Sequence, residues 1–237
     1  MTCLRPPTAP GFDRRTAMGA IAAGAATLIA GCARARPEPA RLALPLDPQA
    51  TAPPDLVDLA RFDPRLRFDI RYATPANFMR RVLYPVPRAV AQRAVAEALS
   101  RVQTRAEAAG YGLLIFDAYR PWRITRMMWE ETPPAKRAFV ANPATGSRHN
   151  RGASVDLSLH RDGVEVAMPS PYDDFTPAAY RSNTAAPPEA LRLSRMLEEW
   201  MVAEGFLPLP HEWWHFDWKD WQRYPIMDVP LEEVVAG

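Results

Sequence analysis

Hydrophobic residues follow strand and helix periods in turn along the chain. Between Arg65 and Tyr72 an apolar side chain occupies every second position, which predicts a strand. Pro87–Ala109 is rich in alanine and places its larger apolar residues at helical spacing, so it is predicted to form a helix. Gly110 follows directly and is a typical residue for ending such a helix.

The same two periods recur in the rest of the chain. Short apolar or alternating runs predict strands at Leu113–Phe116, Ala153–Leu159 and Trp213–Trp218. Longer amphipathic runs predict helices at Trp122–Glu131 and Glu189–Glu204. The strands are too few and too closely interspersed with helices for a doubly wound parallel sheet. We therefore predict an α+β fold, with a small and mainly antiparallel sheet flanked by helices.

The N-terminal segment has the composition of an export signal. Residues 16–31 are uncharged, small and mostly apolar, and Arg14 and Arg15 precede them. This pattern is typical of a secretory signal and too short for a stable transmembrane anchor. The paired arginines indicate export of an already folded protein, although such a pair also occurs by chance.

The apolar run ends in Leu28-Ile29-Ala30-Gly31-Cys32, which resembles the lipobox of bacterial lipoproteins. The resemblance implies that residues 1–31 are a signal peptide and that Cys32 becomes the lipidated first residue. The protein is then expected on the periplasmic side of a bacterial membrane, held there by its lipid. The alternative is an ordinary signal in which this cysteine has no role.

Composition separates the remainder into a tether and a domain. Residues 32–55 are rich in proline and lack apolar periodicity, as expected of an extended tether, and residues 56–237 are predicted to form one domain. The 237 residues are 48% hydrophobic and 24% charged, which excludes a fully disordered chain. The net charge of +2 comes from the signal segment, so the body is neutral and nucleic acid is not expected as its main partner.

Two motifs contain residues that bind metals. In Ser147-Arg148-His149-Asn150-Arg151-Gly152-Ala153-Ser154-Val155-Asp156, a turn at Gly152 would bring His149 and Asp156 to one point. An imidazole and a carboxylate are suitable ligands for zinc. The alternative is a structural role, with His149 capping a turn and Asp156 paired with an arginine.

The second motif, His211-Glu212-Trp213-Trp214-His215, has two interpretations. In the first it is a helical zinc-protease motif in which both histidines bind the metal. In the second only His215 binds the metal, and Glu212 is the general base. Pro208 and Pro210 oppose the helical form, so the second is favoured. His149, Asp156 and His215 then bind one zinc ion per chain and leave a fourth position for water.

These motifs together resemble the zinc D-alanyl-D-alanine dipeptidases associated with vancomycin resistance. Two further segments match that family in the same order, namely Phe68-Asp69-Ile70-Arg71-Tyr72-Ala73-Thr74 and Asp117-Ala118-Tyr119-Arg120-Pro121. The resemblance implies that Arg120 directs its charge at the oxyanion, with Asp117 as an alternative structural partner. It also implies that Asp173 binds the substrate ammonium group and that Ser147 contacts the substrate near the metal. The segment 168–181 departs from the family pattern, which bears on the choice of substrate.

Three functions follow from this pattern. The leading hypothesis is hydrolysis of the D-Ala-D-Ala dipeptide by a zinc-activated water, in the turnover of cell-wall peptides. The alternatives are a D,D-carboxypeptidase or endopeptidase acting on peptidoglycan, and a catalytically silent lipoprotein that binds the cell wall. Glu212, Arg120 and the three metal ligands are all in place, which disfavours the silent form.

Overall fold

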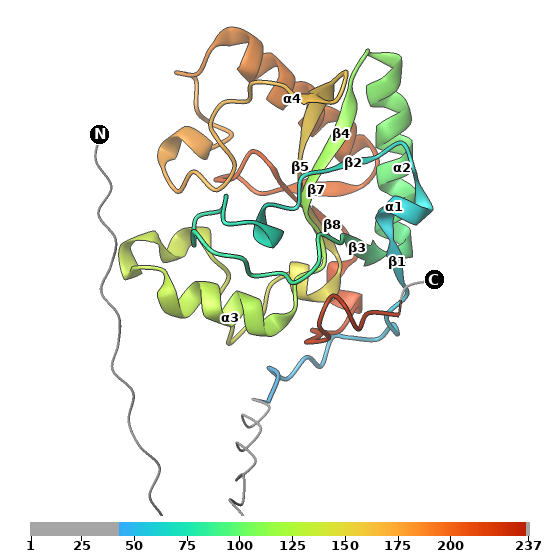
Figure 1. Cartoon of the computed structure of the whole chain (residues 1–237), viewed down its shortest axis with the longest axis vertical. Coiled ribbons are helices and arrows are strands. Elements are labelled where there is room, and N and C mark those ends of the chain that lie inside the picture. Colours follow the sequence, from blue (N-terminus) through green and yellow to red (C-terminus); the bar gives the residue numbers. More distant parts are fainter. Residues whose placement is uncertain (1–42, 236–237) are drawn as a thin grey trace, which may run out of the picture. The chain divides into compact units, whose positions relative to one another are not determined.

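A six-stranded sheet forms the centre of the fold in a computed structural model that describes residues 43–235 (Figure 1). Five strands follow the order β2-β4-β5-β8-β7, and β6 pairs with β5. Every pairing in this sheet is antiparallel except that of β2 with β4, so the predicted α+β class and mainly antiparallel sheet are confirmed. The strands are β2 (Arg67–Phe68), β4 (Gly112–Asp117), β5 (Ser154–Arg161), β6 (Val164–Glu165), β7 (Phe206–Pro208) and β8 (His215–Trp218).

Two long helices cover the sheet. Helix α2 (Arg93–Ala108) packs against β4, and helix α4 (Pro188–Ala203) packs against β7 and against α2. Each helix buries one apolar stripe, as its sequence period predicts. The stripes include Val95, Leu99, Val102 and Ala106 in α2, and Leu193, Leu197 and Met201 in α4. Helix α3 (Trp122–Glu131) lies at the opposite end of the domain from α4 (Figure 1).

A two-stranded sheet corrects the predicted boundary of the first long helix. Val90–Gln92, within the expected helix Pro87–Ala109, forms strand β3 and pairs antiparallel with β1 (Leu56–Asp58). The helix therefore begins only at Arg93. The cause is a pairing between distant segments, which the local apolar period cannot reveal. A short helix, α1 (Leu59–Phe62), follows β1 directly.

The strand predicted at Arg65–Tyr72 is shorter than expected. The alternating apolar positions do mark buried side chains, because Leu66, Ile70 and Tyr72 are buried. Only Arg67–Phe68 pairs with β4, however, and the chain then turns into a 3₁₀ helix. The 3₁₀ helices are η1 (Arg71–Ala73), η2 (Pro134–Phe139), η3 (His149–Arg151), η4 (Pro177–Ala179) and η5 (Trp221–Arg223).

Contacts of the folded unit extend to the N-terminal side of residue 56. The backbone N–H groups of Thr51 and Ala52 donate to the carbonyl of Arg223, and the Asp47 carboxylate pairs with Arg151. The expected signal segment, with Cys32, lies outside the described residues. Within residues 43–235, no helix is both long and apolar enough to cross a bilayer.

Candidate metal centre and active site

Sheet register places three carboxylate and imidazole groups side by side. Asp156 on β5 is the direct partner of Asp117 on β4 and of His215 on β8. Directly paired residues on neighbouring strands have Cβ atoms about 4.5–5.5 Å apart. The sheet itself therefore brings Asp156 and His215 within reach of a common ligand.

His149 reaches the same point from a loop. It begins η3, and Gly152 ends that turn with a left-handed backbone, φ 62°. The left-handed backbone angle favours glycine at this position, and a Cβ atom there would also lie 2.7 Å from a methyl carbon of Leu56, which would have to move. The predicted turn at Gly152 is confirmed, and it carries His149 back over β5.

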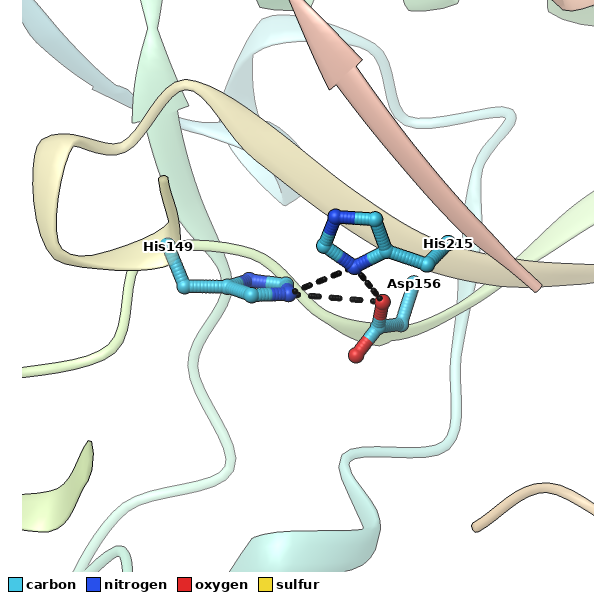
Figure 2. A group of neighbouring side chains, drawn as sticks. All are labelled: His149, Asp156 and His215. Atoms are coloured by element: carbon cyan, nitrogen blue, oxygen red, sulfur yellow. Dashed lines mark hydrogen bonds and ion pairs between the residues drawn. The ribbon is translucent and has the colours of Figure 1, made fainter. Parts of the chain in front are cut away.

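Figure 2 shows the three side chains converging on one another. His149 Nε2 lies 3.2 Å from His215 Nδ1 and 3.3 Å from Asp156 Oδ1, and His215 Nδ1 lies 2.9 Å from Asp156 Oδ1. A zinc ion bound at about 2.0–2.2 Å with tetrahedral angles holds its donor atoms about 3.3–3.6 Å apart. Two of the three separations lie within about 0.1 Å of this range and the third is about 0.4 Å shorter, so the residue types and spacing of the buried triangle suit one such ion.

The outer nitrogen of each histidine is already engaged. Nδ1 of His149 lies 2.6 Å from the carbonyl oxygen of Ala118, to which it donates. Nε2 of His215 lies 2.9 Å from Oδ1 of Asp217 and donates to that carboxylate. Each ring therefore carries its lone pair on the nitrogen that faces the metal position, which is the arrangement found around protein metal sites.

The segment 211–215 settles the two interpretations of its motif in favour of the non-helical one. No helix covers these residues, because a turn leads directly into β8 at His215. His211 is absent from the metal-binding group and instead contacts the rings of Phe139 and Tyr180, with centroids 6.2 Å away in each case. His215 is thus the histidine of this motif that faces the metal.

Glu212 lies on the edge of the same centre. One carboxylate oxygen is 3.9 Å from Nδ1 of His215, and the side chain lines a pocket of about 240 Å³. Burial raises the pKa of the Glu212 carboxyl to about 7. A carboxyl group with such a pKa can accept and release a proton near neutral pH.

Arg120 is buried in the wall of the same pocket and firmly held. Its Nε and Nη2 atoms donate to Asp117 Oδ2 at 2.9 and 2.6 Å, and Nη2 lies 3.7 Å from Asp156 Oδ2. The guanidinium also packs over the ring of Tyr72, 5.1 Å from its centroid. The predicted pairing with Asp117 is present, and it fixes a permanent positive charge at the pocket wall.

Asp173 brings a buried carboxyl group to the pocket. Tyr72 donates to its Oδ1 at 3.1 Å, whereas Oδ2 is buried and lacks a hydrogen-bond partner among the described residues. Its backbone is left-handed, with φ 60°. Burial and the nearby charge of Asp156 raise the pKa of the Asp173 carboxyl well above its usual range. A buried acceptor without a partner in a pocket indicates a place for a ligand group.

Ser147 also lines the pocket, but its groups are partly engaged within the loop. Its N–H donates to Oδ1 of Asn150 at 2.7 Å, and its hydroxyl oxygen accepts from the N–H of His149 at 3.2 Å. The hydroxyl proton is free to turn toward the pocket. The structure thus brings all seven site residues expected within the domain to one pocket.

Sequence reasoning missed two residues that orient the ligands. Tyr172 donates to Asp156 Oδ2 at 2.9 Å, and Asp217 accepts from His215. A signal for Asp217 was present, because a residue two positions beyond His215 on a strand lies on the same face. Tyr172 comes from a loop without periodicity, and the resemblance of that loop to the family's substrate loop assigned a role to Asp173 but not to Tyr172.

Comparison with protein families gives a match over most of the chain. Residues 53–230 match the model of Peptidase_M15, described as D-ala-D-ala dipeptidase. This range includes every candidate residue of the pocket.

Curated relatives agree with this match. The chain is 30% identical over 174 residues to a D-alanyl-D-alanine dipeptidase of Escherichia coli, covering 73% of this chain and 89% of the relative. It is 33% identical over 188 residues to one of Streptomyces coelicolor, covering 70% and 93%. Among solved structures, VanYB in complex with D-Alanine-D-Alanine matches with TM-score 0.38 and 17% identity, over 55% of this chain and 72% of that chain.

Proposed function

The chain belongs to the Peptidase_M15 family of D-ala-D-ala dipeptidases, and from this membership we propose that it hydrolyses the D-Ala-D-Ala dipeptide with one bound zinc ion. The observation that carries the proposal is the triangle of His149, Asp156 and His215. Three converging lone pairs with both outer nitrogens engaged form a stable group when a cation lies between them. Zinc in such a site lowers the pKa of bound water toward about 7 and polarises a carbonyl group.

Glu212 is the proton carrier of this proposal. Its carboxylate takes a proton from the attacking water and gives it to the departing amine. Burial favours this role, since a buried carboxyl with a pKa of about 7 exchanges protons readily in both directions at neutral pH. Its position three residues before His215 keeps it beside the metal ligands without making it one.

Arg120 stabilises the negative charge that develops on the carbonyl oxygen. Its guanidinium is buried and held by Asp117, so it does not have to reorganise during the reaction. A fixed cation in a site that excludes water lowers the energy of an oxyanion far more than one in solvent.

Asp173 and Ser147 bind the dipeptide. Oδ2 of Asp173 is free to accept from an ammonium group, which a dipeptide carries and an internal peptide bond does not. The pocket of about 240 Å³ is smaller than the roughly 300–1,000 Å³ of pockets that hold drug-sized ligands, as suits a dipeptide. Both features favour D-Ala-D-Ala over intact peptidoglycan.

One digestion series tests this function. Purified zinc-loaded protein is incubated with D-Ala-D-Ala, with L-Ala-L-Ala and with an intact muropeptide, and free alanine is measured. We expect release from D-Ala-D-Ala alone. Release from the muropeptide but not from the dipeptide would refute the proposal and identify a peptidoglycan carboxypeptidase or endopeptidase.

We also propose that the protein is exported and anchored through lipid on Cys32. The support is the lipobox-like run Leu28–Cys32 and the charged, then apolar, residues before it. An exported enzyme is poorly placed to intercept a dipeptide made in the cytoplasm, so turnover of cell-wall peptides is the favoured role.

Metabolic labelling with a fatty-acid analogue tests the anchor. The wild type is expected to carry the label and to fractionate with membranes, and Cys32→Ser is expected to lose both. The matched control is Cys3→Ser, which changes the cysteine that cleavage would remove. Unchanged labelling of the Cys32→Ser protein would exclude lipidation at this residue.

A further inference from the structure

The proposed substrate has a charged group for which the site described so far provides no partner. D-Ala-D-Ala is a zwitterion, and Asp173 accounts only for its ammonium end. Burying a carboxylate without an opposite charge or hydrogen-bond donors is costly. A pocket that selects this dipeptide therefore needs a cation on the side away from Asp173.

Two arginines line the pocket, and they differ in what they already bind. Arg120 is buried, and two of its nitrogens are held by Asp117. Arg148 is 42% exposed, and among the described residues its terminal Nη atoms have no hydrogen-bond acceptor. His211, the third basic side chain outside the metal group, has its pKa lowered by burial. Arg148 is thus the more exposed of the two permanent cations in this pocket, and both of its terminal nitrogens are available to a ligand.

Arg148 is held in place by groups that leave those donors free. Its Nε lies 3.5 Å from Oδ2 of Asp217, and its guanidinium carbon lies 4.6 Å from the centroid of the Trp221 ring. Its backbone carbonyl accepts from the N–H groups of Arg151 and Ala153, in the turn that carries His149. A guanidinium stacked on an aromatic ring keeps its outer edge available for a carboxylate.

Arg148 and Asp173 line the same pocket and contact the metal ligands through different residues. Asp173 connects to the metal ligands through Tyr72, Tyr172 and Asp156. Arg148 connects to them through Asp217, which contacts the opposite side of His215. The carboxyl group of Asp173 and the guanidinium of Arg148 thus contact the metal ligands through separate residues, so they do not share a partner. A dipeptide has two charged ends, and each end needs a partner of its own.

We propose that Arg148 binds the C-terminal carboxylate of the substrate and makes the enzyme select peptides with a free C-terminus. This assignment rests on the proposed dipeptidase function. It assigns Arg120 to the reacting carbonyl and Arg148 to the terminal carboxylate, so that the two arginines do not compete for one group.

The test compares D-Ala-D-Ala with D-Ala-D-alaninamide, which lacks only the carboxylate charge. Steady-state rates are measured for zinc-loaded wild type, Arg148→Gln, Arg148→Lys and the control Arg192→Gln, an exposed arginine on α4. We expect Arg148→Gln to lower kcat/KM for the acid by about 10- to 100-fold, the value of a charge-assisted hydrogen bond, and to leave the amide within about twofold. Arg148→Lys should restore part of the preference, and Arg192→Gln should behave as wild type.

Binding supplies a second readout that does not depend on turnover. Calorimetry with D-Ala-D-Ala in a Glu212→Gln background should show weaker binding of the acid, but not of the amide, when Arg148→Gln is added. Zinc content must be equal in both proteins. Equal losses for acid and amide would overturn the assignment while leaving the dipeptidase function intact. A wild type that cleaves neither compound would refute the dipeptidase function, and the assignment of Arg148 with it.

Discussion

The two walls of the pocket are built in different ways. The metal wall consists of His149, Asp156 and His215, placed by strand register and by one tight turn. The loop wall consists of Phe78, Phe139, Asp173, Phe175 and His211, which come from four separate segments and meet mainly through aromatic rings. Hydrogen bonds of 2.6 and 2.9 Å fix the outer nitrogens of the two histidines in the first wall, whereas ring contacts with centroids 4.7–6.2 Å apart form the second.

Because of this difference, we expect the metal wall to determine the reaction and the loop wall to determine which substrate binds. A strand residue cannot shift without its neighbours, so the metal wall tolerates little change. Packed rings from separate loops tolerate substitutions of similar size more readily. We therefore expect variants of the metal wall to abolish the reaction, and variants of the loop wall to alter binding while the metal stays in place.

The largest effect is expected from His215, and His211 is its matched control on the loop wall. His215→Ala should remove most of the zinc and all measurable turnover, because two ligands cannot hold the ion as three do. His211→Ala should keep zinc at wild-type content. Elemental analysis of the purified proteins measures the zinc content of both variants. If His211→Ala loses as much zinc as His215→Ala, His211 belongs to the metal wall and the two walls are not distinct.

Glu212 is expected to have the next largest effect. Glu212→Ala should keep its zinc and its fold, because the side chain faces the metal wall without belonging to it. General acid–base groups contribute about 10²–10⁴-fold in rate, and Glu212 serves both water attack and amine departure. The measurement is steady-state hydrolysis of D-Ala-D-Ala by the zinc-replete variant. Turnover close to that of wild type would exclude Glu212 as the general base.

Arg120 should have a smaller effect, confined to the chemical step. Arg120→Ala is expected to lower kcat by about 10²–10³, the typical cost of losing one oxyanion donor, with a lesser rise in KM. Arg120→Lys should restore only part of the rate, since one ammonium group cannot reproduce the fork held by Asp117. A change in KM alone would make Arg120 a substrate anchor.

The sequence predicted the metal wall far better than the loop wall. His149, Gly152, Asp156 and His215 lie in two short motifs whose geometry is set by one turn and by strand period. The helix start at Arg93 escaped prediction because it depends on a contact outside the local pattern, whereas Asp217 was missed although strand period places it on the same face as His215.

The loop wall escaped prediction for a related reason. A segment without a repeating apolar pattern brings Phe175 to the pocket and Tyr172 to Asp156. Asp173 was found only through family resemblance. Its left-handed backbone and unpartnered oxygen, which mark it as a binding residue, are properties of the folded chain.

Asp173 gives the smallest expected effect on the reaction and the sharpest test of the loop wall. Asp173→Asn should weaken binding of D-Ala-D-Ala by about 10- to 100-fold, because an amide cannot form a charge-assisted hydrogen bond with the ammonium group. Zinc content and the rate at saturating substrate should change little. Steady-state kinetics separates the two quantities, and a large fall in kcat with unchanged KM would contradict the assignment.

The pH dependence of the same residue has a definite sign. Burial raises the pKa of Asp173 in the folded protein, so the carboxyl is neutral below that pKa and charged above it. Substrate binding by wild type should therefore tighten as the pH rises through the pKa of Asp173.

The stability of the folded protein should change in the opposite direction. A carboxyl group whose pKa is raised by folding lowers the free energy of unfolding as the pH rises above its pKa in the unfolded chain. Asp173→Asn removes that loss, so its Tm should exceed that of wild type by more at pH 8 than at pH 5. An equal Tm difference between Asp173→Asn and wild type at both pH values would show that Asp173 has an ordinary, solvated pKa. A higher difference at pH 8 would show that the protein keeps this functional carboxylate at a cost in stability.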